Sequence, residues 1–120
     1  MPGVGTWRAD LKVRATLDAR IGAIMATLKE TEIRQRLMTM PEWSLVGSAI
    51  YRKYTFQSFL PAIAFVNRVA EAAEKADHHP DITINYNQVS ISLSTHSESG
   101  VTEKDFQLAE AIDKIHASGT

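Results

Sequence analysis

Between residues 82 and 93, apolar and polar side chains alternate in two short runs, and this pattern constrains the fold more than any other in the chain. The two runs share an apolar face, which consists of Ile82, Ile84, Tyr86, Val89, Ile91 and Leu93. A period of two residues is typical of a strand with one buried face. With Asn87 and Gln88 as the turn between the runs, the pattern predicts a β-hairpin whose apolar side needs a covering layer.

Residues 57–75 predict the long helix that can supply this layer. Apolar side chains recur there at helical spacing along one face, which consists of Phe59, Ala62, Ile63, Val66, Val69, Ala70 and Ala73. Pro61 falls in the first turn, where proline is tolerated. Phe65, Ala72 and Ala76 extend the apolar arc beyond the area that one sheet covers. We expect this extra surface to contact a second subunit; packing of the N-terminal residues against it is the alternative.

A shorter helix precedes these elements. Thr27 and Glu30 have the spacing of a capping box, which predicts the helix start, and Pro41 predicts its end. Its apolar face consists of Ile33, Leu37 and Met40.

The remaining segments complete a predicted α+β fold. Residues 43–46 and 50–56 predict two strands around a loop at residues 47–49, and Thr102 begins a final helix with a second cap-like spacing. The resulting order is α-β-β-α-β-β-α. It predicts an antiparallel four-stranded sheet with the helices packed on one face.

The chain's 120 residues suit one domain, which we place at residues 27–118. Residues 1–26 form an N-terminal extension with two open interpretations. The alternation from Leu11 to Ile21 has the period of a strand, whereas Leu17, Ile21, Ile24, Met25 and Leu28 also fit one helical face.

Composition excludes several classes of protein. A net charge of −1 offers no electrostatic basis for binding nucleic acid or an anionic membrane. The absence of cysteine excludes disulfides and thiol nucleophiles. No apolar run reaches the roughly 20 residues of a membrane-spanning helix. We therefore expect a cytoplasmic protein.

Residues 77–96 hold three of the four histidines, His78, His79 and His96. Imidazole titrates near neutral pH, so three rings brought together by the hairpin would form a site for acid–base chemistry. Three unrelated polar loop residues are the alternative. A zinc site is the less favoured use, because adjacent ligands suit tetrahedral geometry poorly and no His-x-x-x-His spacing is present.

Three further side chains have simpler structural interpretations. His116 fits a solvated position at the end of the last helix. Asp105 fits a helix-capping carboxylate, and Tyr86 fits an aromatic residue of the strand core.

Three segments, AEKADHHP at 73–80, YNQV at 86–89 and LSTH at 93–96, together resemble the pterin-4a-carbinolamine dehydratases. The family pattern is a charged residue, His-His-Pro, an aromatic residue, a later His and then an Asp. In this chain the pattern falls on Asp77, His78, His79, Pro80, Tyr86, His96 and Asp105. The resemblance extends over residues 28–117.

The resemblance implies an enzyme of tetrahydrobiopterin recycling that removes water from 4a-hydroxytetrahydropterin to give quinonoid dihydropterin. It implies that His78, His79 and His96 carry the proton transfers, with no metal and no cofactor, since the pterin is the substrate. It implies a structural role for Asp105. The substrate-binding residues that it implies are Asp77, Pro80, Ser94, Thr95, Ser97 and Tyr86.

The resemblance leaves a second class of function open. The same fold also serves as a non-enzymatic dimerisation or assembly factor, so a protein partner is the alternative to the enzyme. In either case we expect a homodimer or homotetramer that associates through the helix at residues 57–76 and a sheet edge.

Overall fold

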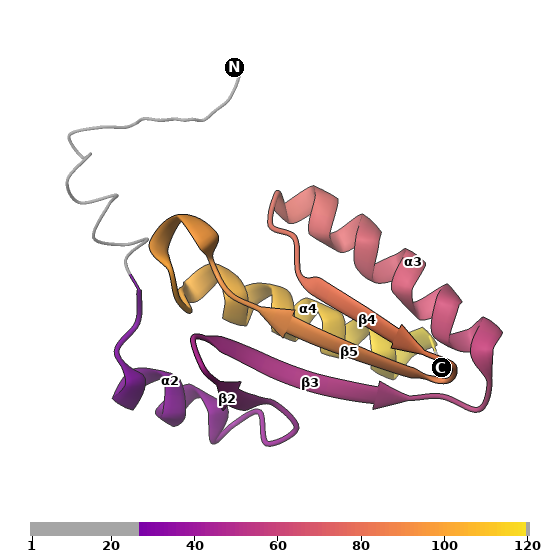
Figure 1. The fold of residues 1–120 in the computed structure, drawn as a ribbon, viewed down its shortest axis with the longest axis horizontal. Helices are drawn as coiled ribbons and strands as arrows, with labels where there is room; N and C mark the ends of the chain where they lie inside the picture. Colours follow the sequence, from indigo (N-terminus) through magenta and orange to yellow (C-terminus); the bar gives the residue numbers. More distant parts are fainter. Residues whose placement is uncertain (1–26, 120) are drawn as a thin grey trace, which may run out of the picture.

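Four antiparallel strands form one sheet in the order β2-β3-β5-β4, which confirms the predicted α+β class (Figure 1). The computed structural model describes residues 27–119. The predicted N-terminal extension, including the alternation from Leu11 to Ile21, lies outside the described residues. The elements, in chain order, are α2 (Glu30–Leu37), β2 (Ser44–Val46), β3 (Ala49–Thr55), α3 (Phe59–Ala76), β4 (Asp81–Asn85), β5 (Gln88–Leu93), the 3-10 helix η1 (His96–Glu98) and α4 (Glu103–Gly119).

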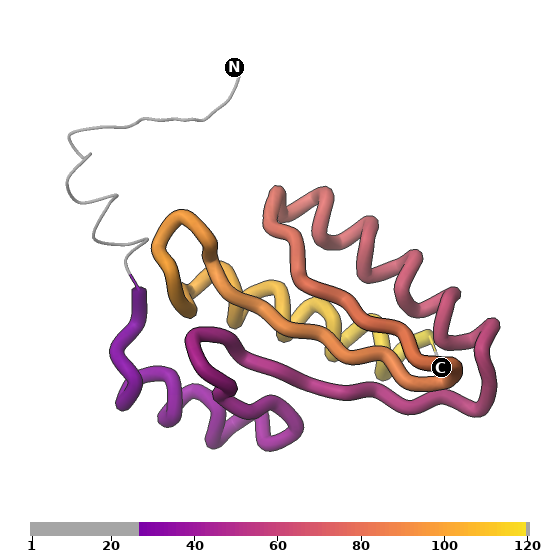
Figure 2. The backbone as a smooth tube through the Cα atoms, in the orientation of Figure 1, coloured from indigo at the N-terminus to yellow at the C-terminus, as the bar shows by residue number. Residues whose placement is uncertain are grey.

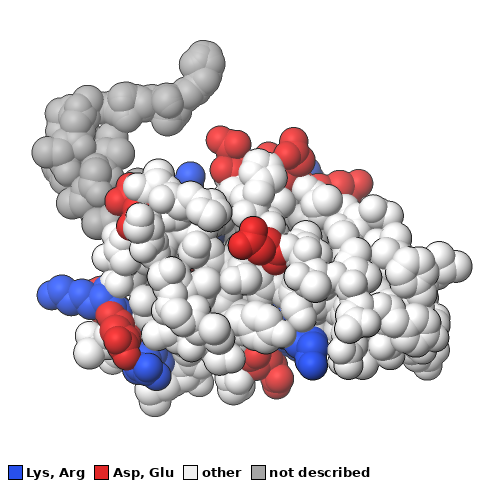
Figure 3. Space-filling view, viewed as in Figure 1, with Lys and Arg blue, Asp and Glu red and all other residues white. Residues whose placement is uncertain are grey.

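The core lies between the sheet and helices α3 and α4. The inward residues of β5, Val89, Ile91 and Leu93, are completely buried, and they pair with Tyr54, Arg52 and Ile50 of β3. The alternate residues face the other way, where the Tyr51 hydroxyl lies 3.0 Å from the Ser90 hydroxyl. That outer surface is mostly uncharged over the strands, and most of the charged side chains lie around its rim (Figure 3).

The predicted orientation of the apolar face of helix α3 is wrong. Phe65, expected at a subunit interface, has no exposed surface, whereas Phe59, expected in the core, is 46% exposed. The reason is that α3 packs against α4 as well as the sheet, so its buried face is Ala62, Phe65, Val69 and Ala73.

Asp113 of α4 joins this helix to the sheet through a partly buried polar cluster. Its Oδ1 accepts hydrogen bonds from Tyr54 Oη at 2.6 Å and Arg52 Nη1 at 2.8 Å, and its carboxylate also accepts from Trp43 Nε1. Burial and the neighbouring Asp113 both raise the pKa of Tyr54, so the phenol stays protonated and donates.

Two predicted boundaries shift for identifiable reasons. The helix α2 begins at Glu30, and Lys29 N donates to Glu32 Oε1 at 2.9 Å, so the capping box predicted at Thr27–Glu30 is wrong. The Thr27 hydroxyl instead donates to the Glu98 carbonyl at 2.8 Å.

The β4–β5 turn is Tyr86–Asn87 rather than Asn87–Gln88, and Tyr86 adopts a left-handed φ of 55°. Asn87 is held beside Phe56: Phe56 N donates to the Asn87 carbonyl, and Asn87 Nδ2 donates to the Phe56 carbonyl, each at 2.8 Å. Gln88 therefore belongs to β5, where it pairs with Asn85, and Tyr86 is 63% exposed rather than in the core.

Within the described part of the chain, none of the helices combines the length and the apolar character needed to cross a membrane.

Candidate functional site

The connection from α3 to β4 and the connection from β5 to α4 lie at one end of the sheet, opposite the β4–β5 turn (Figure 2). Between them is a cavity of about 240 Å³, which we call the histidine cavity. Its lining residues are Asp77, His78, His79, Ser94, Thr95, His96, Ser97 and Lys104. The structure therefore places all three predicted histidines around one space.

The end of α3 explains how the first two histidines reach this cavity. Asp77 takes the left-handed conformation with φ 51°, a position that Asp tolerates better than most residues. His78 N then donates to the Ala73 carbonyl at 3.1 Å and Asp77 N donates to the Glu74 carbonyl at 3.2 Å. This pair of hydrogen bonds is a Schellman motif, which turns the chain back over the helix end.

His78 forms the most enclosed contact of the site. Its side chain is 9% exposed, and its Nε2 lies 2.5 Å from Oδ1 of Asp105, which has no exposed surface. With Asp105 as a carboxylate, its oxygen can only accept a hydrogen bond, so this contact favours the His78 tautomer with the hydrogen on Nε2. The pairing leaves Nδ1 as the ring nitrogen that is not committed to Asp105.

The other oxygen of Asp105 ties the site to the start of α4. Asp105 Oδ2 accepts from Thr102 N and from the Thr95 hydroxyl, both at 2.9 Å, while Thr102 Oγ1 accepts from Lys104 N at 3.3 Å. The bonds between Thr102 and the first turn form a capping box with Asp in place of Glu. The expected capping role of Asp105 is thus present together with its contact to His78.

His79 and His96 are the more exposed rings. His79 Nε2 lies 2.6 Å from Oε2 of Glu74, with a side-chain exposure of 58%. His96 begins η1 beyond the end of β5, after Thr95 and Gly100 pair across the loop base, with Thr95 N donating to the Gly100 carbonyl at 2.8 Å. The strand alternation that would align His96 with Ser90 and Ser92 therefore stops before it.

Two of the substrate-binding residues implied by the resemblance do not line the histidine cavity. Pro80 precedes β4 and fits the shaping of the turn. Tyr86 lies at the far turn of the hairpin, separated from the cavity by the length of β4, about 17 Å for five residues. The structure does not bring Tyr86 to this site.

Two further residues of the site, Glu74 and Lys104, occupy no position of the family pattern. Glu74 contacts His79, five residues later, whereas the i, i+4 spacing of a helix would pair it with His78, so the sequence carried no signal for this contact. Lys104 lines the cavity beside Asp105 and places a cation there, but a lysine in the first turn of a helix carries no distinctive pattern.

An ion pair between Arg36 and Glu103 connects α2 to the first residue of α4. Arg36 Nη1 donates to Glu103 Oε1 at 2.6 Å and Nη2 donates to Oε2 at 3.0 Å. The hydrogen bonds from Arg36 lower the pKa of Glu103, and they outweigh the opposing effect of its burial. The guanidinium also lies 4.6 Å from the ring centroid of Phe106.

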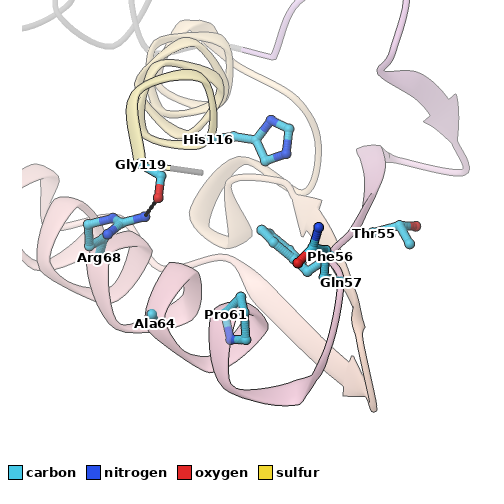
Figure 4. Close-up of a pocket in the computed structure, with 8 residues that line it drawn as sticks. All are labelled: Thr55, Phe56, Gln57, Pro61, Ala64, Arg68, His116 and Gly119. Carbon is cyan, nitrogen blue, oxygen red and sulfur yellow. Dashed lines mark hydrogen bonds between the residues drawn. The ribbon is translucent and has the colours of Figure 1, made fainter.

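A larger cavity, of about 450 Å³, lies at the opposite end of the molecule between α3 and α4 (Figure 4). Its lining includes His116 and Arg68, and the Arg68 guanidinium donates to the Gly119 carbonyl at 3.2 Å. It contains none of the three clustered histidines, so we assign the candidate site to the smaller histidine cavity.

His116 is not the solvated residue that was expected. Its ring lies 4.9 Å from the Tyr54 ring and 5.8 Å from the Phe65 ring, measured between centroids. Burial lowers the pKa of His116, and Arg52 adds to the decrease while Asp113 opposes it.

Among residues 27–119, no group of three or more His, Asp or Glu side chains has an arrangement that could hold a metal ion.

Most of the chain is similar in sequence to known proteins. Residues 26–115 match the family model described as pterin 4 alpha carbinolamine dehydratase. A provisionally named pterin-4-alpha-carbinolamine dehydratase from Picosynechococcus sp. is 51% identical over 92 residues, covering 76% of this chain and 100% of that protein. Another with the same provisional name, from Chloroflexus aurantiacus, is 52% identical over 91 residues, covering 76% of this chain and 98% of that protein.

Two solved structures share the fold. The crystal structure of a transcriptional coactivator/pterin dehydratase from Brucella melitensis matches with a TM-score of 0.71 and 40% identity, covering 74% of this chain and 97% of that one. A pterin dehydratase-like protein described as a RuBisCO assembly factor of the alpha-carboxysome matches with a TM-score of 0.53 and 20% identity. The match covers 65% of this chain and 89% of that one. At that identity the second match shows the fold alone.

Proposed function

The chain belongs to the pterin 4 alpha carbinolamine dehydratase family, and from this premise we propose that its histidine cavity dehydrates 4a-hydroxytetrahydropterins by acid–base catalysis. The enzyme is a carbon–oxygen lyase. The observation that carries the proposal is that His78, His79 and His96 line one cavity whose other walls supply hydroxyl groups.

The reaction needs two proton transfers. The bond between C4a and the hydroxyl oxygen breaks as that oxygen receives a proton and leaves as water. The N5 hydrogen of the pterin departs as a proton, and its electron pair forms the double bond between C4a and N5. Imidazole and imidazolium can serve both steps near neutral pH, without a metal or an organic cofactor.

We assign the proton acceptor to His78. Its Nε2–H is held by the buried Asp105, so the proton from N5 would enter at Nδ1. The carboxylate then stabilises the imidazolium that forms, as in other carboxylate–histidine pairs. His79 and His96 are the exposed rings, and they can exchange protons with solvent, so we assign proton delivery to the leaving hydroxyl to this pair.

The polar lining provides the groups for orienting the pterin ring. Ser94, Thr95 and Ser97 offer hydroxyls or backbone groups from one wall, and Asp77 offers a carboxylate from the other. A pterin carries ring amide and amino groups that pair with such donors and acceptors. Supply of quinonoid dihydropterin to a reductase, in a cytoplasmic tetrahydrobiopterin recycling sequence, is the role that this proposal implies.

The proposal also includes a homo-oligomer. β4 is an edge strand, and Ile84 on it is 39% exposed, while Leu60 in the first turn of α3 is 74% exposed. These residues, rather than Phe65, are the candidates for a contact through α3 and a sheet edge. Sedimentation of the wild type at micromolar concentration tests this, and a monomer would contradict it.

The decisive experiment is a direct assay with 4a-hydroxytetrahydropterin, following water loss against the spontaneous rate. We expect a rate increase that disappears in the His78→Ala, His96→Ala double variant. Full activity in that folded double variant would contradict histidine catalysis. The absence of any rate increase in the wild type would favour the alternative, a non-enzymatic assembly or dimerisation factor with the same fold.

A further inference from the structure

A second cavity adjoins the histidine cavity. It has a volume of about 400 Å³ and lies between α3 and α4; we call it the α3–α4 groove. Its lining residues are Ala72, Lys75, Ala76, His78, Lys104, Gln107, Leu108 and Ala111. His78 and Lys104 line both cavities, so these two side chains form the boundary between them.

The two spaces together have the volume that a small organic ligand needs, whereas the histidine cavity alone does not. Cavities that enclose a small organic ligand usually measure about 300–1,000 Å³. The histidine cavity, at about 240 Å³, lies below this range, whereas the groove beside it adds about 400 Å³. A ligand that occupies both can bury more of its surface than the histidine cavity alone allows.

The chemistry of the linings differs in a corresponding way. The histidine cavity offers imidazole, hydroxyl and carboxylate groups, which suit a planar heterocycle. The apolar lining of the groove consists of Ala72, Ala76, Leu108 and Ala111, and its polar lining residues include Lys75 and Gln107. Such a surface suits an alkyl or hydroxyalkyl chain, because its carbons can contact the apolar residues while any hydroxyl pairs with the polar ones.

We propose that the α3–α4 groove binds the substituent at C6 of the pterin, and that the three alanines determine which substituents fit. This inference rests on the proposed dehydratase function. Each alanine leaves space that a larger side chain would occupy. Lys104 and His78 lie where the substituent passes from the ring site to the groove, so their positions set the direction in which it leaves.

The test compares two substrates that differ only in the groove-binding part. 4a-Hydroxytetrahydropterins with a methyl or a propyl group at C6 are assayed with the wild type and with Ala76→Phe. Ala76 is exposed, so the larger side chain can be accommodated without disturbing the core. We expect the ratio of kcat/KM for propyl to kcat/KM for methyl to fall about 10-fold, as for other apolar pockets that lose room for a few methylenes.

Ala64→Phe is the matched control, because Ala64 is also exposed on α3 but lies outside the groove. It should leave the propyl-to-methyl ratio at its wild-type value. An unchanged ratio in Ala76→Phe would overturn the proposal. A loss for both substrates together with a smaller sedimenting species would also overturn it, because the groove would then be a contact with a second copy.

A binding measurement separates this inference from the proposed function. Fluorescence titration with 6-methylpterin and 6-propylpterin needs no turnover. If the wild type fails to turn over either substrate, the dehydratase function is contradicted, while tighter binding of 6-propylpterin that Ala76→Phe removes would still support the groove. Equal affinities for both pterins in the wild type would contradict the groove.

Discussion

Phe65 packs its ring against that of Tyr54, with the two centroids 4.8 Å apart and neither side chain appreciably exposed. Phe56 lies on another side of Phe65, at a centroid distance of 5.1 Å. These contacts join the middle of α3 to the end of β3. They make Phe65 a core residue of the single chain.

Replacing Phe65 with alanine should therefore lower the free energy of unfolding by about 3–5 kcal/mol, the usual cost of truncating a buried phenylalanine. Denaturant titration measures the change. Met38, which is 79% exposed, gives a control whose replacement by alanine should change stability by no more than about 0.5 kcal/mol. If the Phe65→Ala protein kept wild-type stability but dissociated into smaller species, Phe65 would be a residue of a subunit interface and not of the core.

The order of elements could be predicted because hydrophobic periodicity is a local property of the chain. The alternation in residues 82–93 and the helical spacing in residues 57–75 each identify an element without knowledge of its neighbours. The orientation of α3 could not be predicted in this way, because it depends on where α4 packs. The turn at Tyr86 likewise depends on Asn87 pairing with Phe56, 31 residues away in sequence.

Each of the three clustered histidines should be needed for turnover. Single replacement of His78, His79 or His96 by alanine should lower kcat by about 10-fold or more, as expected for a general acid–base group. Chelator treatment should leave the wild-type rate unchanged. Loss of activity that added zinc restores would instead support a metal site.

Asp105→Asn should lower turnover by about 10-fold or more, because an amide oxygen carries no charge to stabilise the His78 imidazolium. The variant also changes a helix cap, so activity is compared per folded molecule. Asp113→Asn is the matched control: it alters a polar cluster between α4 and β3 and should lower stability while leaving kcat unchanged. Equal losses of kcat in both variants would argue for a purely structural role of Asp105.

The stability of the protein should fall on mild acidification, in part through His116. Its pKa is lowered below the ordinary 6.5, so the unfolded chain binds the proton more readily than the folded one. His116 contributes this stability above pH 6.5, the pKa in the unfolded chain. The contribution is lost as the pH falls through the lower pKa of the folded protein. His116→Phe should reduce the difference in urea midpoint between about pH 7.5 and about pH 5.5. A difference equal to that of the wild type would contradict this assignment.

Residues 1–24 should be dispensable for the chemistry. The described contacts with the loop of η1 begin at Thr27 and Leu28, and Leu28 N donates to the Val101 carbonyl at 2.8 Å. A protein that begins at Met25 keeps both. Its kcat per folded active site should match that of the full chain. A large decrease in a well-folded truncation would show that the first residues contribute to the site.

The candidate site was predictable to the extent that its residues form a motif. His78, His79 and His96 could be grouped because they flank the two ends of a hairpin, and these ends lie side by side. The structure places all three around one cavity. Glu74 and Lys104 could not be assigned, because a charged residue on a helix is ordinarily solvated. The assignment of Tyr86 to the site was wrong for a geometric reason. The two ends of a hairpin lie together beside the histidine cavity, whereas its turn, which contains Tyr86, lies a full strand length away.

Asp105 lies at the third position of α4, where it closes the capping box with Thr102 and also holds His78. Helix ends open and close locally far more often than whole domains unfold. Each opening of this first turn would break the contact between Asp105 and His78, which the proposed mechanism requires. Amide hydrogen exchange at Thr102, whose N–H donates to that carboxylate, would then report how often the contact between Asp105 and His78 is open.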